Sequence, residues 1–349
     1  MRALSGISGE EIAAEVDVRS DILVSVVIPC RNEKNYIQRC LDSVLSSDYS
    51  GNMEILVVDG MSDDGTRTIL QDLHRLDARI ILLDNPKKDT PNALNIGIQF
   101  SKGNAILILG AHSELADNYI SSMVQLLFSD ETIGCVGGRT IPEAKGSALQ
   151  IAIAEALKSR FGVGNSYYRV PGANIREVDT VAYGLYRREA IEKIGLLNTE
   201  LIRNQDIEFN ARLRRAGYRI VMDPRVFVYY HPRITFQSFC RQNYGNGFWN
   251  IITWKKAPGS LSWRHFVPLA FVLSLGICLL GSIWLSGFRW LLLLILLPYT
   301  LLDLVETTKC LIQRKNLNSI IISLIFPVLH ISYGIGSLAG LFAQLRRSA

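Results

Sequence analysis

Short apolar runs alternate with amphipathic stretches through the first two thirds of the chain. The runs are rich in β-branched residues and are followed by turn-forming residues, as is typical of buried strands. They cover residues 22–29, 53–59, 79–84 and 104–110. Between them, residues 35–45 and 66–76 place apolar side chains on one helical face. This alternation of strand and helix predicts an α/β fold with a mostly parallel sheet.

The pattern changes near residue 264, where long apolar runs replace the alternation. Residues 266–302 carry a single charge, Arg289, and a central Ser-Gly-Phe divides them into two runs that each approach the ~20 residues needed to span a bilayer. A third uncharged run, 317–345, contains a proline and glycines, which transmembrane helices tolerate. We expect about three transmembrane helices within residues 264–345. The alternatives are a buried pair of core helices and, for the third run, a re-entrant segment or hairpin.

The distribution of charge also indicates a membrane boundary. The net charge of +5 comes entirely from residues 264–349, which hold 7 basic and 2 acidic residues, whereas residues 1–263 hold 30 of each. A nucleic-acid-binding protein would carry its basic excess on a folded polar domain, so we expect no nucleic-acid partner. Short basic loops favour the cytosolic side, which places the loop 309–315 there. With three spans, the Arg-Arg pair at 346–347 would face outward against this trend.

Two segments flank the predicted domain, which covers residues 22–235. Residues 1–21 form a polar extension without the apolar core of a signal peptide, so we expect the domain in the cytosol. Residues 236–260 interleave aromatic and basic side chains, which suits single-stranded nucleic acid or an amphipathic segment at a membrane interface. The position directly before the apolar runs favours the interface. The six cysteines form no CxxC pair and are expected to be reduced and mostly buried.

Polar residues follow the first two predicted strands, as PCRNE (29–33) and DGMSDDGT (59–66). The carboxyl ends of parallel strands meet at one edge of a sheet, and two polar strand ends there form a crevice suited to a nucleotide. A carboxylate such as Asp59 can accept a hydrogen bond from a base or a ribose hydroxyl. As a strand-end residue, Asp59 is expected to add little to the core. Taken alone, each motif is explained equally well by a turn followed by a helix cap.

Taken together with later segments, these motifs resemble glycosyltransferase family 2, a class of inverting enzymes with the GT-A fold. The resemblance rests on VSVVIPCRNE (24–33), EILVVDGMSDDGT (54–66), PNALNIG (91–97), VGGR (136–139), RNQDIEFN (203–210) and RQNYG (241–245). It implies a Rossmann-like GT-A domain followed by C-terminal transmembrane helices. It also implies a set of residues that bind the nucleotide-sugar donor: Pro29, Arg31, Glu33, Asp59, Arg241 and Gln242.

The resemblance extends to the exopolysaccharide enzymes of the succinoglycan-assembly type. It implies a membrane-anchored, inverting hexosyltransferase that moves a sugar from a nucleotide-diphosphate donor, in the first place a UDP-sugar, to a lipid-linked saccharide. The reaction would take place on the cytosolic side of the inner membrane in extracellular polysaccharide biosynthesis, with polysaccharide-assembly proteins as further partners. The alternatives are an inactive GT-A scaffold in such a complex and an enzyme that glycosylates a polyprenyl phosphate. A processive synthase is less favoured, because about three apolar runs are few for threading a polymer.

The chain departs from the family at the metal site. Family members carry Asp-x-Asp, or Asp-Ala-His in this branch, after the strand at 105–109, and these side chains hold Mg²⁺ or Mn²⁺ against the donor diphosphate. Here Gly110 replaces the first carboxylate, while His112 and Glu114 remain as metal ligands, and an imidazole suits Mn²⁺ better than Mg²⁺. Three alternatives stay open: a divalent metal held by His112, Glu114 and the diphosphate; catalysis through basic side chains; and an inactive domain.

The resemblance also assigns a catalytic base. The family carries a Glu-Asp pair where this chain has Gln205 and Asp206, and the second acid removes the proton of the acceptor hydroxyl. Asp206 is therefore the predicted catalytic residue, and Glu208 is expected to orient the acceptor or cap the helix that begins there. Without the family context, Asp206 would be taken for a helix cap. The arginines at 187–188 and 212–215 are expected to lie on solvated helix faces.

Overall fold

The computed structural model describes residues 22–143, 146–170, 172–231, 235–315 and 320–348. These residues form two compact units, each described by itself below. The first unit takes its residues from 1–140 and 171–230, and the second from 141–170 and 231–349. The polar extension predicted at 1–21 lies outside the described residues.

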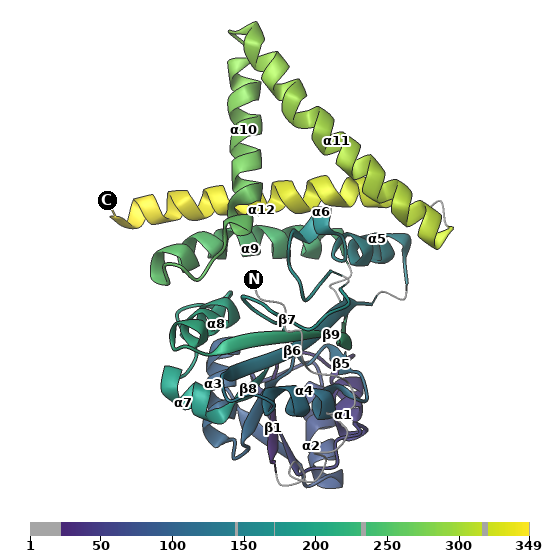
Figure 1. Ribbon diagram of the computed structural model, residues 1–349, viewed down its shortest axis with the longest axis vertical. Coiled ribbons are helices and arrows are strands. Elements are labelled where there is room, and N and C mark those ends of the chain that lie inside the picture. The colour runs from purple at the N-terminus through teal and green to yellow at the C-terminus, as the bar shows by residue number, and fades with distance from the viewer. Residues whose placement is uncertain (1–21, 144–145, 171, 232–234, 316–319, 349) are drawn as a thin grey trace. The chain divides into compact units, whose positions relative to one another are not determined.

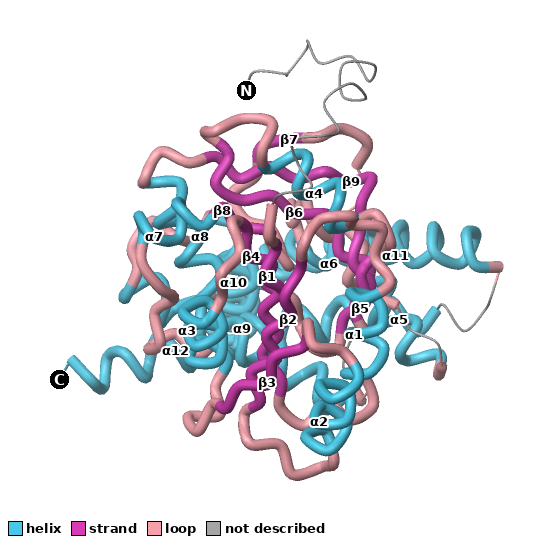
Figure 2. The backbone as a smooth tube through the Cα atoms, turned by 90° about the horizontal axis from the view of Figure 1, so that it is seen from below, coloured by secondary structure: helices cyan, strands magenta, loops and turns pink. Residues whose placement is uncertain are grey.

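The first unit is built on one mixed sheet (Figures 1 and 2). Its strands are β1 (Val24–Cys30), β2 (Met53–Asp59), β3 (Ile80–Asp84), β4 (Ala105–Ile108), β5 (Ser113–Leu115), β6 (Ile133–Pro142), β7 (Arg176–Glu177), β8 (Leu185–Arg187) and β9 (Arg219–Tyr230). Their order is β3-β2-β1-β4-β8-β6-β9-β5, with β7 paired to β9. The half containing β3, β2, β1 and β4 is parallel, whereas β8 pairs antiparallel with β4 and β6.

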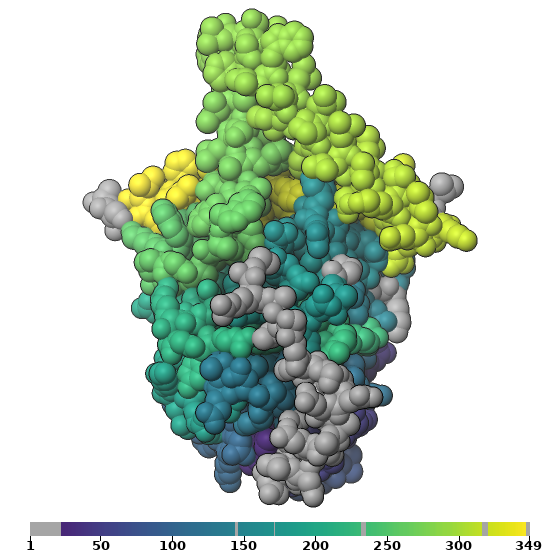
Figure 3. Space-filling model, viewed as in Figure 1, coloured from purple at the N-terminus to yellow at the C-terminus, as the bar shows by residue number. Residues whose placement is uncertain are grey.

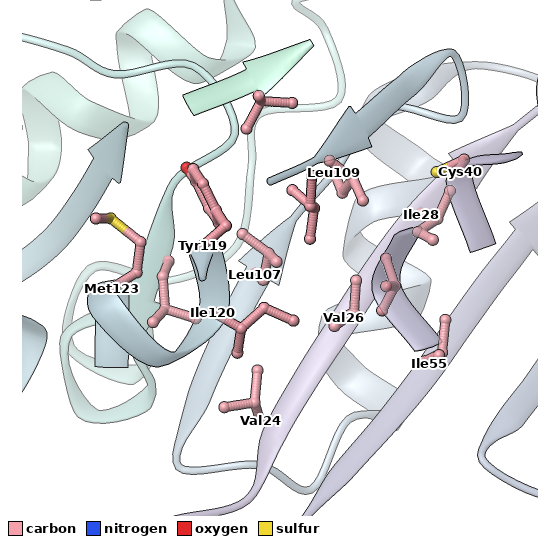
Figure 4. Close-up of a cluster of buried hydrophobic side chains, with 14 of the residues drawn as sticks. Val24, Val26, Ile28, Cys40, Ile55, Leu107, Leu109, Tyr119, Ile120 and Met123 are labelled. Carbon is pink, nitrogen blue, oxygen red and sulfur yellow. The ribbon is translucent and has the colours of Figure 1, made fainter. Parts of the chain in front are cut away.

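Helices cover both faces of this sheet, because its strands are apolar on both sides. They are α1 (Ile37–Leu45), α2 (Thr66–Leu76), α3 (Thr90–Phe100), α4 (Tyr119–Leu127), α7 (Arg188–Ile194) and α8 (Gln205–Arg215). On one face Val24, Val26 and Ile28 pack with α1, α2 and α4 (Figure 4). On the other face, α3 approaches so closely that a Cβ atom on Gly97 would overlap the side chain of Val27. The core therefore fixes the parallel strand ends that carry the polar motifs.

The predicted strands and helices of this unit are confirmed. Each of the four apolar runs forms one of the strands β1 to β4, and the two amphipathic stretches form α1 and α2. The antiparallel half was not predicted. Its strands β5, β7 and β8 span only two or three residues, and strands this short leave no periodic signal in the sequence. The longer strands β6 and β9 were also missed.

The second unit is helical. Its elements are α5 (Ala148–Ala156), α6 (Arg160–Val163), α9 (Phe236–Lys256), a 3₁₀ turn at Trp263–Phe266, α10 (Val267–Gly281), α11 (Ser286–Arg314) and α12 (Ile322–Ser348). A small core of α5, α9, α11 and α12 includes Ala152, Phe239 and Phe326. Most of the segment predicted at 236–260 thus forms one long helix, α9, which begins with a capping box at Thr235 and Ser238, and residues 257–260 form a turn after it.

Three helices of the second unit are long and apolar enough to cross a membrane, over residues 263–281, 286–314 and 322–346. α10 and α11 meet at a short turn and diverge from it (Figures 1 and 3), and only 6% of the most apolar stretch of each is buried. α12 differs, since 39% of its apolar stretch is buried. The predicted change to membrane helices after residue 264 is therefore confirmed.

α9 and α12 pack closely along their lengths, as Figure 1 also shows. Glycines make this approach possible: a Cβ atom on Gly247 or Gly336 would overlap backbone atoms of the facing helix. Gly340 lies one helical turn after Gly336, and a Cβ atom there would lie 2.8 Å from the carbonyl oxygen of Phe248. The small residues that transmembrane helices tolerate thus serve here as a packing seam.

Candidate active site

The loops that follow β1 and β2 meet at one edge of the sheet. Cys30 and Asp59 are register partners at the ends of these strands, and the N–H of Gly60 donates to the carbonyl of Cys30 over 2.7 Å. Asn32 adopts a left-handed backbone and is bound by the second loop, since its N–H donates to Oγ of Ser62 over 2.9 Å. The two polar motifs predicted to form a crevice are therefore in direct contact.

Asp59 lies inside this edge rather than on it. Its side chain is wholly buried, where it accepts hydrogen bonds from the Ser62 hydroxyl (2.6 Å) and from Nη1 of Arg67 (2.9 Å). The expectation that Asp59 adds little to the core is wrong, because this carboxylate ties the loop after β2 to α2. Arg67 also donates to Asp84 over 2.6 Å, and the bonds to Asp84 and Asp59 raise the pKa of its guanidinium.

Arg67 is a residue that the sequence analysis missed. It lies in the first turn of α2, directly after the DGMSDDGT motif, and its side chain is 33% exposed. The signal was an arginine in the first turn of the helix that follows the strand-end acid Asp59. Because Arg67 bridges Asp59 and Asp84, the acid that the family pattern selects is linked to a partly exposed cation at the same edge.

The other residues predicted to bind the donor also lie at this edge. Pro29 is half-buried in β1, and Arg31 is exposed, with its side chain against Gly60 and its Nη1 3.4 Å from the carbonyl of Lys88. Glu33 is held by its backbone N–H, which donates to Oγ1 of Thr66 over 2.9 Å. The structure brings these side chains together with the loop after β3.

His112 faces Glu33. Nδ1 of His112 lies 3.3 Å from Oε1 of Glu33, so this nitrogen carries the proton when the carboxylate is ionised. Nε2 is then the ring nitrogen with a lone pair, which is the arrangement of metal-ligating histidines that donate to a carboxylate. Glu114 lies on the short strand β5, half-buried and paired with Tyr229 of β9.

The described residues contain no group of three His, Cys, Asp or Glu side chains arranged to hold a metal ion. The protein donors at this edge therefore fit a divalent metal only if the diphosphate and water supply the remaining ligands, as Mg²⁺ sites commonly require. His112 fits such a role through Nε2. Glu33, which the family pattern assigns to the nucleotide, is the carboxylate that orients His112.

The two acids at the start of α8 differ sharply. Asp206 is exposed in the first turn, whereas Glu208 is 7% exposed. Arg212 binds Glu208 with two hydrogen bonds, of 2.7 Å from Nε and 2.9 Å from Nη2. Glu208 thus forms an ion pair within α8, and Asp206 is the acid that a substrate can approach.

Buried polar contacts fix the position of α8. Asn210 lies in its second turn, accepts a hydrogen bond from the hydroxyl of Tyr186 (3.0 Å) and donates to Thr180 (2.8 Å). Gln205, which stands where the family has an acid, has a buried Oε1 without a hydrogen-bond partner among the described residues. The helix that carries Asp206 is therefore anchored to β8 from its buried face.

The arginines near these elements are mostly structural, contrary to the prediction. Arg187 is 8% exposed and donates to the carbonyls of Ile133 and Leu127, and Arg188 donates to Gly103 and Ser101. Arg212 binds Glu208 as described above. Only Arg214 and Arg215 of this set are exposed as expected. The sequence shows the charge of Arg187 and Arg188 but not the backbone carbonyls that accept their hydrogen bonds.

Arg241 and Gln242 belong to the second unit. They lie in the second turn of α9, where Arg241 is exposed and Gln242 half-buried. Their predicted contact with the donor stays a prediction.

Comparison with known proteins identifies the chain. The family model "Glycosyl transferase family 2" matches residues 25–195, and "Glycosyl transferase family group 2" matches residues 181–303. The succinoglycan biosynthesis protein ExoA of Rhizobium meliloti is 31% identical over 70% of this chain and 74% of its own length. The chain belongs to glycosyl transferase family 2. It is a glycosyltransferase, and the predicted family is confirmed.

Two further comparisons support the fold and the type of pathway. A Methanococcus voltae dolichyl N-acetyl-alpha-D-glucosaminyl phosphate 3-beta-D-2,3-diacetamido-2,3-dideoxy-beta-D-glucuronosyltransferase is 26% identical over 89% of this chain and 95% of its own. The mannosyltransferase PcManGT of Pyrobaculum calidifontis, solved with GDP-Man and Mn²⁺, matches with a TM-score of 0.59 at 18% identity over 91% of this chain and 87% of that chain. The chain is thus similar to membrane-type family 2 enzymes of polysaccharide or lipid-linked glycan biosynthesis, and the predicted GT-A fold is confirmed.

Proposed function

We propose that this glycosyltransferase 2 protein transfers a sugar from a nucleotide-diphosphate donor, in the first place a UDP-sugar, to a lipid-linked saccharide with inversion. The observation that carries the proposal is the exposed carboxylate of Asp206 on an anchored helix. The second acid of this helix, Glu208, is hydrogen-bonded to Arg212. An exposed carboxylate of this kind is what a single-displacement transfer needs. The donor end would be the edge formed by the loops after β1, β2 and β4.

In this mechanism Asp206 accepts the proton of the acceptor hydroxyl. The acceptor oxygen attacks the anomeric carbon as the bond from that carbon to the diphosphate breaks, so the nucleoside diphosphate leaves from the opposite face and the configuration inverts. A carboxylate is far less basic than an alkoxide. It must therefore take the proton late, within hydrogen-bond contact of about 2.6–3.2 Å.

The donor edge would hold the nucleotide through both charge and shape. Arg31, which is exposed, and Arg67, which is partly exposed, are cations at this edge, and Asp59 fixes Arg67 in place. Pro29 and Glu33 line the same strand end. A divalent metal, bound through Nε2 of His112 with Glu114 and the diphosphate, would neutralise charge on the leaving group. The presence of Mn²⁺ in the structure of PcManGT supports the use of a divalent metal.

The acceptor and the location follow from the relatives and the apolar helices. The ExoA name points to succinoglycan biosynthesis and the M. voltae name to a dolichyl phosphate-linked sugar, and in both a lipid-linked glycan is a consistent acceptor. Helices α10 to α12 would keep the enzyme at the inner membrane, with the first unit on the cytosolic side and polysaccharide-assembly proteins nearby. Arg241 and Gln242 of α9 are further proposed donor residues, as the family resemblance implies.

A donor screen tests this function. Membranes with the full-length protein are incubated with UDP- and GDP-sugars, with Mn²⁺, Mg²⁺ or EDTA, and nucleotide release is measured with and without extracted lipid-linked saccharides. We expect release of one nucleotide, dependent on the lipid fraction and strongest with Mn²⁺. Transfer to a simple polyprenyl phosphate would favour the polyprenyl-phosphate enzyme. Silence with every donor would favour an inactive scaffold, which the lack of a three-residue metal site among the described residues makes the second candidate.

A further inference from the structure

The space next to Gly110, at the end of β4, is filled by Tyr183. A Cβ atom on Gly110 would lie 3.2 Å from Cε1 and 3.7 Å from the hydroxyl oxygen of this tyrosine. Gly110 does not have the left-handed backbone that favours glycine, so the neighbouring ring explains why residue 110 has no side chain. Residues 110 and 183 are therefore in tight contact: even a Cβ atom at position 110 would require the ring to shift slightly.

The backbone holds Tyr183 in this place. Its φ of 53° is left-handed, a conformation that is uncommon for residues other than glycine and that clusters at functional sites. Its carbonyl accepts a 2.7 Å hydrogen bond from the hydroxyl of Tyr119, a fully buried residue whose oxygen also accepts the N–H of Gly138. The next residue is tied to β4, because the N–H of Ile108 donates to the carbonyl of Gly184 over 3.0 Å. The unusual conformation is thus fixed from both sides.

The hydroxyl of Ser113 is a second observation that indicates a ligand next to Gly110. Oγ of Ser113 would lie 3.4 Å from the same Cβ position on Gly110, and Ser113 is wholly buried. This oxygen has no hydrogen-bond partner among the described residues, although buried hydroxyls nearly always have one. Ser113 also closes the turn that carries His112, since its N–H donates to the carbonyl of Gly110.

We propose that Tyr183 binds the diphosphate of the donor: its phenol donates a hydrogen bond to a diphosphate oxygen, with Ser113 as a second donor. A phenol has an ordinary pKa of about 10 and so remains a neutral donor at pH 7, and its bond to an anionic oxygen is charge-assisted. The diphosphate fits because the end of β4 lies beside β1, where the proposed nucleotide residues begin. The inference rests on the proposed function and adds a residue that no sequence motif indicates. The neutral hydroxyl of Tyr183 then takes the place of the carboxylate that family members carry at the position of Gly110.

The direct test removes the phenol oxygen. Tyr183→Phe in the full-length protein is compared with wild type by calorimetry, using UDP and GDP and their nucleosides. We expect the affinity for the accepted nucleoside diphosphate to fall about 10-fold, as for loss of one charge-assisted bond, while nucleoside affinity stays within about 2-fold. The control is Tyr218→Phe, whose ring lies beside Lys193. An unchanged diphosphate affinity in Tyr183→Phe would overturn the inference.

A pair of substitutions tests the match between the two positions. Gly110→Asp alone should weaken diphosphate binding, because its Cβ meets the ring, and Tyr183→Gly should weaken it by removing the hydroxyl. The double variant should recover part of the affinity and need Mn²⁺ for it, since a carboxylate then stands where the phenol stood. If Gly110→Asp is equally harmful with and without Tyr183→Gly, the match is wrong. Wild-type protein that binds no nucleotide would instead overturn the proposed function, and the inference with it.

Discussion

Two of the buried carboxylates in the first unit, Asp59 and Glu208, are held by arginines. Asp59 joins the loop after β2 to Arg67 of α2, and Glu208 joins Arg212 within α8. Arg212 also donates to the carbonyls of Ile194 and Leu196, so it connects α8 to the end of α7. Asp59, Asp206 and Glu208 look equally suited to catalysis or binding in the sequence. They differ in the structure, because the fold gives Asp59 and Glu208 an arginine partner and leaves Asp206 exposed.

Asp59→Ala should destabilise the first unit and weaken donor binding together. The substitution leaves partly buried hydrogen-bond donors of Ser62 and Arg67 without their acceptor, which costs up to about 1–3 kcal/mol. Thermal unfolding of the detergent-purified protein measures the loss of stability, and calorimetry with UDP and GDP measures the loss of affinity. Asp84→Ala is the matched control: it removes the exposed partner of the same Arg67 and should lower the melting temperature less. Equal melting temperatures for wild type and Asp59→Ala would show that the buried carboxylate is dispensable.

Helices and strands with a strong hydrophobic period could be predicted from the sequence. Short strands and contacts between residues far apart in the chain could not. β1 to β4, α1 and α2 follow from apolar runs and amphipathic faces. The family resemblance pointed to Asp206, and the structure leaves that residue exposed. The links from Arg67 to Asp59 and from Tyr183 to Gly110 join residues through tertiary contacts, which leave no periodic pattern in the sequence. For the same reason the sequence could not show that Arg187 and Arg188 bind backbone carbonyls.

At the level of helices, the seam between α9 and α12 should be sensitive to side-chain size. Gly336→Leu places a branched side chain where even a Cβ atom would overlap the backbone of Tyr244. We expect the variant to unfold at a lower temperature and to be cleaved faster by protease within α12. Gly287→Leu on α11 is the control, because no atom lies within 4 Å of a Cβ atom there. If both variants behave as wild type, the close packing of α9 against α12 is incorrect.

At the scale of the membrane unit, we predict two spans and a third helix that stays on the side of α9. α12 runs alongside α9 and across α10 (Figure 1), and it is far more buried than α10 and α11. A hairpin of α10 and α11 then returns the chain to the side where it started. This arrangement puts the basic residues of 309–315 and 346–347 on one side, in agreement with the positive-inside trend that three spans would violate.

Labelling with a membrane-impermeant maleimide distinguishes the two topologies. In a protein without its six native cysteines, Lys315→Cys and Arg346→Cys should react from the same side of sealed vesicles, and Gly287→Cys from the other. Lys315→Cys serves as the internal reference, because both topologies place it opposite to Gly287→Cys. Reaction of Arg346→Cys from the side of Gly287→Cys would show three spans.

The most direct measurement of the whole account is the turnover of Asp206→Asn. Asparagine keeps the shape of the side chain and removes its basicity, so kcat should fall by about 10²-fold or more while donor affinity changes little. Glu208→Gln is the matched control on the same helix: it loosens the contact with Arg212 and should lower thermal stability more than kcat. Nucleotide release under saturating donor and lipid acceptor is measured for wild type and both variants. Near-normal turnover of Asp206→Asn with an inactive Glu208→Gln would make Glu208 the base, and normal turnover of both would contradict the mechanism proposed for this enzyme.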